Sequence, residues 1–518
     1  IDCKTGNKLM GSTTNKFKLH LAEKLFNSFS TDNIWLFIGK PVAWADDTDP
    51  LLLGQQGYTT DSLLAEMQNW DDIMSVQRVS DISYVVPYKE ISNNTTFSQY
   101  DDNSNIFDSA TLDDFFGVST SGGQYRVYKC ISNNSGSTVS NVPTAEQNAV
   151  IKSADGYVWK YMYSIGSSDW AKYQVSSGAM GNWMPVKKQL TDDSSGQFDT
   201  AMKNATDGEI LHVTTAGSTT FGNVSGSHFA DKVGHNVVIN RNHTGTGFGS
   251  GFTGVVAQHS GANYYIDVTN GGSDYRKIAT IETENGGNYV NAAAHLRPVL
   301  SPIGGHGWDA VSELGGFRIM VYAELTTSMS DFILENDFRK VGLITNPYKQ
   351  GSVFDYIQTV DSTDSYISGE KYSTATNARQ LVKIVFEDVD WNNATTAHIQ
   401  TAATNDTIFT QVDSSGVETD NKARLVEIDG DNKTAYFLVT AGSIDTSVVF
   451  QTTTLNYPKM KGLINGTSTT LTIKDSSLSS VTKEKLKKYS GNIIYIDNIS
   501  SVTRSSESTQ KVKLVIEF

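Results

Sequence analysis

One stretch near residue 160 constrains the fold more than any other part of the chain. The turn signal Asp155-Gly156 leads directly into a segment in which four aromatic residues alternate with other side chains: Tyr157, Trp159, Tyr161 and Tyr163. A period of two is typical of a β-strand and places the four rings on one face. Each ring can bury ~150–250 Å² when it is covered. The pattern predicts a core strand in a sheet that packs against a second layer, and packing alone is the simplest role for it.

The composition argues against several classes of protein. The 518 residues exceed one ordinary hydrophobic core and suggest about two to four compact units. A total of 41 Lys and Arg against 56 Asp and Glu gives a net charge of −15, which argues against a nucleic-acid partner because such proteins neutralise phosphates with basic side chains. No apolar run approaches the ~20 residues of a membrane-spanning helix, so we expect no membrane partner.

The cysteines and the N-terminus indicate no disulfide scaffold or metal site. Cys3 and Cys130 are too few for a disulfide scaffold or a cysteine-based zinc site, so we expect free thiols in a reducing cell. The chain begins with Ile1 instead of Met, and we expect the native N-terminus to precede it.

The first 90 residues predict two helices and two strands. Thr14 to Phe29 carries a broad apolar stripe of helical period. Ile34 to Ile38 has no polar alternation and fits a strand that is covered on both faces. A second helix is expected from about Ser62 to Met74, capped by Thr60 or Asp61, with one apolar face: Leu63, Met67, Trp70 and Met74. A strand from Val76 to Val86 is expected to follow.

A polar stretch then leads to the next predicted strand. Residues 91–124 are rich in Asn, Asp, Ser and Gly and predict a long surface loop, with a short helical turn near Leu112 to Phe116. Gln124 to Ile131 alternates as a strand.

Two regions have the composition of inserted β modules. Residues 191–310 are rich in Gly, Thr, Asn and Ser, with short β-prone pieces such as Tyr264 to Val268. Two similar turn sequences begin at Asn270 and Asn285, and their Asn-Gly-Gly strings predict tight hairpin turns. Residues 375–475 are again β-rich and Thr-rich.

Two loops resemble ligand sites without completing one. His306 and Asp309 could form a metal-ligand or acid–base pair, but nothing nearby in the sequence completes the site, so a shaped surface loop is the preferred interpretation. Asp429-Gly430-Asp431-Asn432-Lys433 resembles a calcium loop but lacks the downstream Glu, and we expect a hairpin turn there. The sequence therefore predicts no metal site, no cofactor site and no catalytic residues.

The rest of the chain predicts further strands around one short helix. Phe317 to Leu325 and Phe338 to Asn346 read as strands, the second ended by Pro347. Leu486 to Tyr489 is expected to finish a short basic helix. A strand at Asn492 to Asn498, a polar loop containing Arg504, and an alternating strand from Val512 to Phe518 complete the pattern.

Four ordered stretches of this chain resemble the baseplate wedge subunit of T-even-like contractile-tailed bacteriophages, the product of their gene eight. They are residues 13–90, the strands Gln124 to Ile131 and Asp155 to Tyr163, the strand ending in Thr345-Asn346-Pro347, and the C-terminal Ser490-Gly491 to Phe518. One difference lies at Ile499 to Val502, where the family usually has Arg and paired prolines.

The expected fold is mainly β with minor α, a layered antiparallel β-sandwich core with a few peripheral helices and inserted all-β modules. The first family-like part of the core is residues 1–190 and the second is 311–374, and residues 476–518 supply C-terminal strands that complete it. Residues 191–310 and 375–475 are the two inserts.

The resemblance implies a structural protein with no enzymatic activity. Such a subunit binds other baseplate wedge proteins, is expected to be a homodimer, and belongs to the tail baseplate of the virion after assembly in the host cytoplasm. No hydrolase elbow, phosphate-binding Walker loop or zinc-protease helix motif occurs in the sequence.

The main alternative is a tail-associated protein that binds or cleaves glycans. Glycosidases hold two carboxylates ~5–9.5 Å apart. The clustered candidates are Asp46, Asp47 and Asp49, and Asp101 and Asp102, although clustered acids are more often found in solvated turns. A cleft that brings two carboxylates together beside exposed aromatic rings would favour this alternative.

Overall fold

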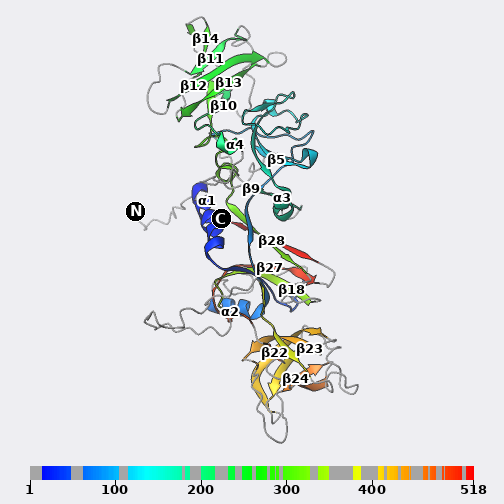
Figure 1. The fold of residues 1–518 in the computed structure, drawn as a ribbon. Helices are drawn as coiled ribbons and strands as arrows, with labels where there is room; N and C mark the ends of the chain where they lie inside the picture. The colour runs from blue at the N-terminus through cyan, green and yellow to red at the C-terminus, as the bar shows by residue number, and fades with distance from the viewer. Residues whose placement is uncertain are drawn as a thin grey trace, which may run out of the picture. The chain divides into compact units, whose positions relative to one another are not determined.

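The computed structural model describes residues 14–47, 62–103, 115–177, 181–186, 200–215, 232–239, 248–258, 264–276, 281–285, 288–290, 296–326, 336–348, 377–386, 407–412, 417–429, 433–442, 444, 459–464, 467–473, 481–482, 485–504 and 509–518. Strands make up 54% and helices 15% of the structure, so the fold is mainly β, as predicted. It consists of several antiparallel sheets, two of which curl into half-barrels (Figure 1).

The chain divides into two compact units. The first unit contains Ile1–Phe26, Ile82–Val321 and Lys513–Phe518, and the second contains Asn27–Asp81 and Tyr322–Val512.

Four sheets belong wholly or mostly to the first unit. A four-stranded sheet has the order β4 (Phe116–Ser119), β5 (Tyr125–Ser132), β7 (Val158–Ile165) and β6 (Ile151–Lys152). A five-stranded sheet has the order β28 (Gln510–Glu517), β17 (Arg318–Leu325), β3 (Asp81–Pro87), β9 (Gly181–Val186) and β8 (Val175–Ser177). The insert supplies the pair β10 (Ile210–Thr215) and β16 (Leu296–Leu300). It also supplies a sheet of β13 (Tyr264–Tyr275), β12 (Phe248–Gln258), β11 (Asn236–Ile239), β14 (Ile281–Asn285) and β15 (Asn288–Val290).

The described helices of this unit include α1 (Asn15–Thr31), of which residues 15–26 belong to the first unit and 27–31 to the second. The shorter ones are α3 (Ser167–Tyr173), α4 (Thr200–Lys203) and α5 (Ala310–Glu313), with 3₁₀ turns at Ser121–Gly123 and Asn134–Gly136. The helix predicted from Thr14 is confirmed as α1.

Two sheets and the helix α2 (Leu63–Asp72) lie in the described part of the second unit. The first sheet has the order β19 (Asn377–Arg379), β2 (Ile73–Arg78), β1 (Ile34–Gly39), β18 (Asn336–Thr345) and β27 (Asn492–Arg504). The second, seven-stranded sheet has the order β25 (Thr467–Thr472), β24 (Lys459–Ile464), β21 (Ile408–Val412), β22 (Glu418–Asp429), β23 (Thr434–Ala441), β20 (Val382–Val385) and β26 (Val481–Thr482). Figure 1 shows its strands β22, β23 and β24 in one curved sheet.

The strand β1 is buried along its whole length, as its unbroken apolar run predicts. It pairs with β2 on one side and β18 on the other, so Leu36 lies opposite both Gln77 and Leu343. A central strand with both edges paired and both faces covered has no polar face to present, which explains the absence of alternation.

The aromatic strand β7 is confirmed, but its four rings do not share one face. Tyr157, Trp159 and Tyr161 lie in one apolar cluster, whereas Tyr163 lies in another together with Met162. The pairing with β5 passes from Tyr161 to Tyr163 and skips Met162, which is therefore a bulge residue. A bulge shifts the alternation by one residue and turns the following side chain to the opposite face.

The prediction for α2 is wrong in two respects. Its N-cap is Ser62, whose hydroxyl accepts a hydrogen bond from the Ala65 backbone N–H at 3.2 Å; Thr60 and Asp61 lie outside the described residues. Trp70 is buried as predicted, but it shares the buried face with Ala65 and Asn69, whereas Leu63 is 73% and Met67 41% exposed. The buried Asn69 side-chain oxygen accepts from the Lys340 ammonium at 2.8 Å.

Residues 91–124 are not a surface loop throughout. Ile91, Phe97, Tyr100, Phe115 and Phe116 are all buried, and Phe116 begins β4. Their spacing is irregular, so no strand or helix period marked them in advance. The region of the predicted helical turn falls mostly outside the described residues.

One of the two Asn-Gly-Gly strings does not form the predicted hairpin turn. Asn270 to Gly272 lies inside β13 and pairs with β12, with Phe252 opposite Gly271. Gly272 has φ +64°, and an added Cβ would lie 2.4 Å from the Ser250 carbonyl oxygen, so glycine permits close pairing here. The second string is consistent with the prediction, because Asn285 and Asn288 pair across it.

The predicted C-terminal helix is absent from residues 485–489. The Gln380 side chain accepts from the Leu486 N–H at 2.9 Å and donates to the Leu486 carbonyl at 3.2 Å. These tertiary hydrogen bonds hold Leu486 extended and override its helix propensity.

Arg504 lies in a strand, not in the predicted polar loop. It is the last residue of β27 and is fully buried. Its guanidinium donates to the Thr326 carbonyl at 3.0 Å and to the Gln510 side-chain oxygen at 2.8 Å, so neutral oxygens hold it in the interior.

Candidate functional site

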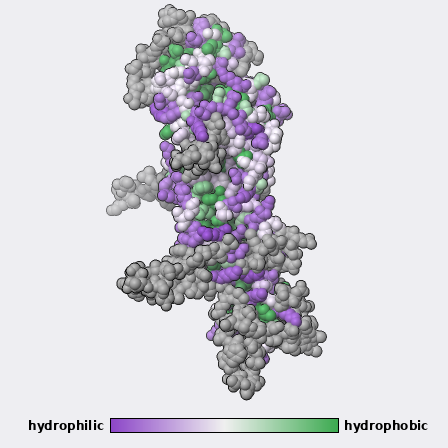
Figure 2. Space-filling view, in the orientation of Figure 1, coloured by the Kyte–Doolittle hydropathy of each residue, from purple (hydrophilic) through white to green (hydrophobic). Residues whose placement is uncertain are grey.

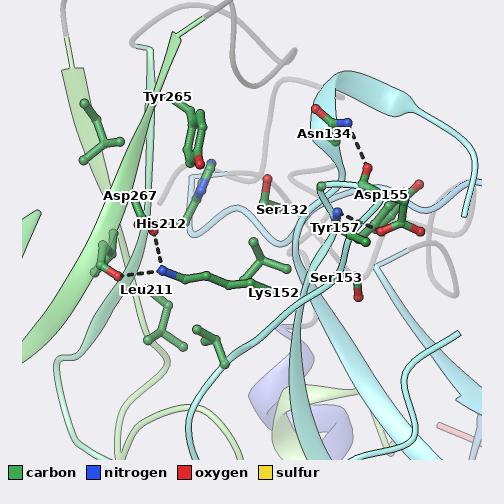
Figure 3. Close-up of a pocket in the computed structure, with 16 residues that line it drawn as sticks. Ser132, Asn134, Lys152, Ser153, Asp155, Tyr157, Leu211, His212, Tyr265 and Asp267 are labelled. Atoms are coloured by element: carbon green, nitrogen blue, oxygen red, sulfur yellow. Dashed lines mark hydrogen bonds and ion pairs between the residues drawn. The ribbon is translucent and has the colours of Figure 1, made fainter. Parts of the chain in front are cut away.

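A polar pocket lies within the first unit, between the four-stranded sheet and the strands of the insert. Its volume is about 240 Å³. One wall comes from β10 and β13 and the other from β6 and the turn that precedes β7 (Figure 3). The residues that line it are Ser132, Asn134, Val150, Lys152, Ser153, Ala154, Asp155, Gly156, Tyr157, Val158, Leu211, His212, Tyr265, Ile266, Asp267 and Val268.

An ion pair joins the two walls of this pocket. Lys152 extends from β6 and donates to a carboxylate oxygen of Asp267 on β13, as Figure 3 shows. The same ammonium lies 3.4 Å from the Val268 carbonyl. The Lys152 side chain is 50% exposed and that of Asp267 is 35% exposed, so water and solutes can reach this pair.

Asp155 shapes the opposite wall through backbone hydrogen bonds. Its carboxylate accepts from three N–H groups, those of Ser140 at 2.8 Å, Asn141 at 2.9 Å and Tyr157 at 3.2 Å. Gly156 follows with φ +84°, and a Cβ there would lie 2.6 Å from the Asn134 side-chain nitrogen. The Asp155-Gly156 turn signal seen in the sequence therefore forms a rigid edge of the pocket.

His212 and Tyr265 complete the wall formed by the insert. His212 is 4% exposed, and burial lowers its pKa from 6.5 to about 3, so the ring is neutral at neutral pH. Burial, with the Asp267 carboxylate as a second cause, raises the pKa of the Tyr265 hydroxyl. Both groups face the pocket as neutral hydrogen-bonding side chains.

A second polar centre is fully buried in the first unit. We call it the Lys129 cluster; it consists of Lys129, Glu313, His306 and Tyr100. The Lys129 ammonium lies 3.0 Å from a Glu313 carboxylate oxygen, 3.1 Å from His306 Nδ1 and 3.7 Å from the centre of the Tyr100 ring. Because an ammonium only donates, His306 Nδ1 accepts and the proton of the neutral ring is on Nε2.

The pKa values in this cluster follow from burial. Burial lowers the pKa of Lys129 and, together with the Lys129 charge, lowers the pKa of His306 well below its ordinary value. Burial also raises the pKa of Glu313, against the opposing effect of Lys129. The other Glu313 oxygen accepts from the Gly307 N–H at 2.7 Å, so every member of the cluster is held in place by a partner.

His306 and Asp309, the two residues singled out from the sequence, do not work together. His306 is 1% exposed, so the prediction of a surface loop is wrong at this position. Asp309 instead caps α5 by accepting from the Ser312 N–H at 3.2 Å. The pair ties the loop to β5 and to α5.

The clustered carboxylates considered for glycan cleavage contact arginines. Asp47 accepts from Arg339 at 2.8 and 2.7 Å, which lowers the pKa of its carboxyl to about 2. Asp101 and Asp102 both accept from Arg297, and Asp102 also approaches the Leu300 N–H at 3.3 Å. Asp46 is exposed, and Asp49 lies outside the described residues. The Arg339 pair keeps the Asp47 carboxyl ionised, unlike a general acid that must carry a proton.

The possible metal loops contribute no metal site among the residues that the structure describes. No group of three or more His, Cys, Asp or Glu side chains there is placed to hold an ion. The strands that flank Asp429 to Lys433 do form the predicted hairpin, with Asp429 opposite Thr434. Residues 430–432 lie outside the described ranges.

Sequence reasoning did not identify the pocket or the Lys129 cluster. A signal for the cluster existed: Lys129 lies in the middle of an aromatic strand, and such a lysine needs a buried partner. Its partner Glu313 lies 184 residues away, so the pairing itself had no local signature. The pocket combines residues from five strands and two turns, so it had no local sequence signature either.

The chain matches no protein-family model and no curated protein. The resemblance to the phage baseplate wedge subunit thus rests on the residues quoted above. Of the helices within the described ranges, none has the length and apolar character needed to cross a bilayer.

Acid is expected to destabilise the first unit through His212. Because its pKa is lowered from 6.5 to about 3, the folded state keeps the ring neutral where the unfolded state protonates it. This contribution to stability is fully present above about pH 6.5 and is lost as the pH falls toward about 3. At ~1.4 kcal/mol per pH unit between the two pKa values, the loss is at most about 5 kcal/mol. Denaturant unfolding at a series of pH values measures it.

A variant isolates the contribution of this histidine. His212→Gln removes the titration, so its stability should fall less with acid than that of the wild type. His20 is exposed, and His20→Gln serves as the matched control that should keep the wild-type pH dependence. The same acid sensitivity in His212→Gln and wild type would contradict the prediction.

Proposed function

We propose that this chain is a structural subunit of a bacteriophage tail baseplate wedge, which acts through contacts with other wedge proteins and has no catalytic role. It would self-associate as a homodimer, assemble in the host cytoplasm and reside in the virion. The observation that carries the proposal is that the family-like segments pair with one another, although long inserts separate them.

The second unit supports this most directly. The strand β18 pairs with β1 and with β27, so that Gly342 lies between Phe37 and Ile496. These three strands come from three separate family-like stretches. Of the described strands in the insert 375–475, only β19 joins the edge of this sheet, and β20 to β25 belong to the seven-stranded sheet.

Hydrogen bonds join chain segments near the two ends of each insert, residues 191–310 and 375–475. In the first unit, the Ser301 N–H donates to the Glu209 carbonyl at 3.1 Å. In the second unit, the Lys485 N–H donates to the Arg379 carbonyl at 3.2 Å. A module can be added to a loop at little entropic cost when the ends of that loop are already close. This geometry fits a shared core with additions specific to one phage.

The candidate carboxylates support a structural role over glycan cleavage. Asp47, Asp101 and Asp102 form arginine pairs that link segments far apart in the chain. On the face drawn in Figure 2 the described surface is mostly hydrophilic or neutral, with small apolar areas. A subunit that binds through such a surface would use many polar contacts around a few apolar ones.

The test is assembly. The purified full-length chain is expected to run as a dimer in size-exclusion chromatography with light scattering, and to co-elute with other tail proteins encoded beside it. A cryo-electron microscopy map of the intact tail should place both units in the wedge. A monomer with no affinity for any tail protein, or a tail map without this chain, would overturn the proposal.

A further inference from the structure

The size of the pocket in Figure 3 limits its occupant to one small group. Pockets for drug-sized ligands usually measure ~300–1,000 Å³, and this one is about 240 Å³. It opens to solvent beside the half-exposed Lys152, so a longer molecule could place one unit inside and continue outside.

The charges of the pocket do not favour an ionic ligand. Lys152 is paired with Asp267, so its ammonium is not an uncompensated cation for a phosphate or carboxylate. The carboxylate of Asp155 accepts from three backbone N–H groups, one in its own turn and two in the loop at Ser140 and Asn141. An anion would meet two nearby carboxylates, and a cation would compete with Lys152.

The hydrogen-bond donors and acceptors of the pocket suit a neutral ligand with several hydroxyl groups. Lys152 has three protons, of which the described structure directs one to Asp267 and one toward Val268, which leaves one for a ligand. Asp267 binds Lys152 through one of its two oxygens. Ser132 and Ser153 add hydroxyls, while the Tyr265 ring and the Leu211 side chain offer surface for C–H groups.

We propose that this pocket binds one neutral sugar residue, either free or at the end of a glycan chain. The paired Lys152 and Asp267 side chains hold two adjacent sugar hydroxyls, because together they present a charged donor and a charged acceptor side by side. Tyr265 covers the C–H face of the ring. Binding occurs without cleavage, since both oxygens of Asp155 already accept backbone hydrogen bonds. The proposal is independent of the structural role proposed above.

The experiment measures sugar binding to the full-length chain. Saturation-transfer NMR is recorded with methyl glucoside, methyl galactoside and N-acetylglucosamine as neutral probes, and with glucuronate, glucosamine and inorganic phosphate as charged ones. We expect at least one neutral pyranoside to bind, and the charged probes to bind at least tenfold more weakly. A trisaccharide of the bound sugar that binds more tightly identifies a glycan end as the ligand; equal affinity identifies the single residue.

Variants connect that binding to the pocket. Asp267→Asn and Tyr265→Ala are each expected to weaken it by at least tenfold. The ion pair is solvent-accessible, so Asp267→Asn keeps the fold, which circular dichroism checks. Trp308 is 44% exposed and lies outside the pocket, and Trp308→Ala is the control that should bind as wild type.

Three results would overturn the proposal. The first is the absence of binding by every neutral probe at millimolar concentration. The second is phosphate or glucuronate binding as tightly as the neutral sugars. The third is unchanged sugar binding in a folded Asp267→Asn variant.

Discussion

Lys129→Met is expected to destabilise the first unit by ~3–5 kcal/mol, because it leaves the Glu313 carboxylate buried without a cation. The Lys129 side chain is 0% exposed and that of Glu313 is 3% exposed, so water cannot replace the lost ammonium. His306 also loses the donor at its Nδ1 atom. Denaturant unfolding, followed by hydrogen exchange in peptides from 125–132, measures the loss in this unit separately from the second unit.

The double variant Lys129→Met/Glu313→Gln separates pairing from packing. The amide oxygen that Glu313→Gln introduces can still accept from the Gly307 N–H, while no buried charge remains. We therefore expect the double variant to be more stable than Lys129→Met alone, since replacing a whole buried ion pair is often close to neutral. Strictly additive losses would show that Lys129 and Glu313 do not interact.

Lys152→Met is the matched control on a solvent-accessible lysine. It also breaks an ion pair, with Asp267, but its side chain is half exposed. Exposed pairs contribute ~0.2–1 kcal/mol, so the loss should be several-fold smaller than at Lys129. A similar loss of stability in Lys152→Met and Lys129→Met would mean that burial does not determine how much a broken ion pair destabilises the unit.

The sequence predicts strands better than it predicts their partners. The alternation in Tyr157 to Tyr163 and the unbroken apolar run at Ile34 to Ile38 identified β7 and β1, because hydrophobic period is a local property. The bulge at Met162 is set by pairing with β5, which no period reveals. Similarly, the residues around Leu486 predict a helix. The Gln380 side chain, 106 residues away, instead holds Leu486 extended.

The candidate site was harder to predict than the fold. His306 was identified because its residue type can do chemistry, yet its role depends on Lys129, which lies 177 residues earlier. In the pocket, the Asp155-Gly156 turn was visible, whereas Asp267 belongs to a separate insert. Only the three-dimensional pairing of strands brings such residues together, so composition and spacing could not predict the site.

Trp159→Ala is expected to cost ~3–5 kcal/mol, the range for removing a large aromatic side chain from a packed core. Trp159 is 0% exposed and is stacked on Tyr157, with ring centres 5.1 Å apart and an angle of 9° between the rings. Phe97 meets it edge-on at 5.3 Å. The substitution removes both ring contacts and leaves a cavity in the apolar cluster on this face of the sheet. Backbone pairing of β5 with β7 limits how far the strands can close it. Hydrogen exchange in the strands β5 and β7 provides a local measurement.

Trp159→Phe distinguishes loss of ring packing from loss of the indole N–H. Among the described residues, the indole nitrogen of Trp159 has no hydrogen-bond partner, so phenylalanine removes a buried polar group that costs free energy. It also keeps one six-membered ring in the cluster. We therefore expect Trp159→Phe to lose less than half as much stability as Trp159→Ala. Equal losses would indicate that the N–H is satisfied in solution, whereas a negligible loss in Trp159→Ala would show that this strand is not part of the core that holds the four-stranded sheet.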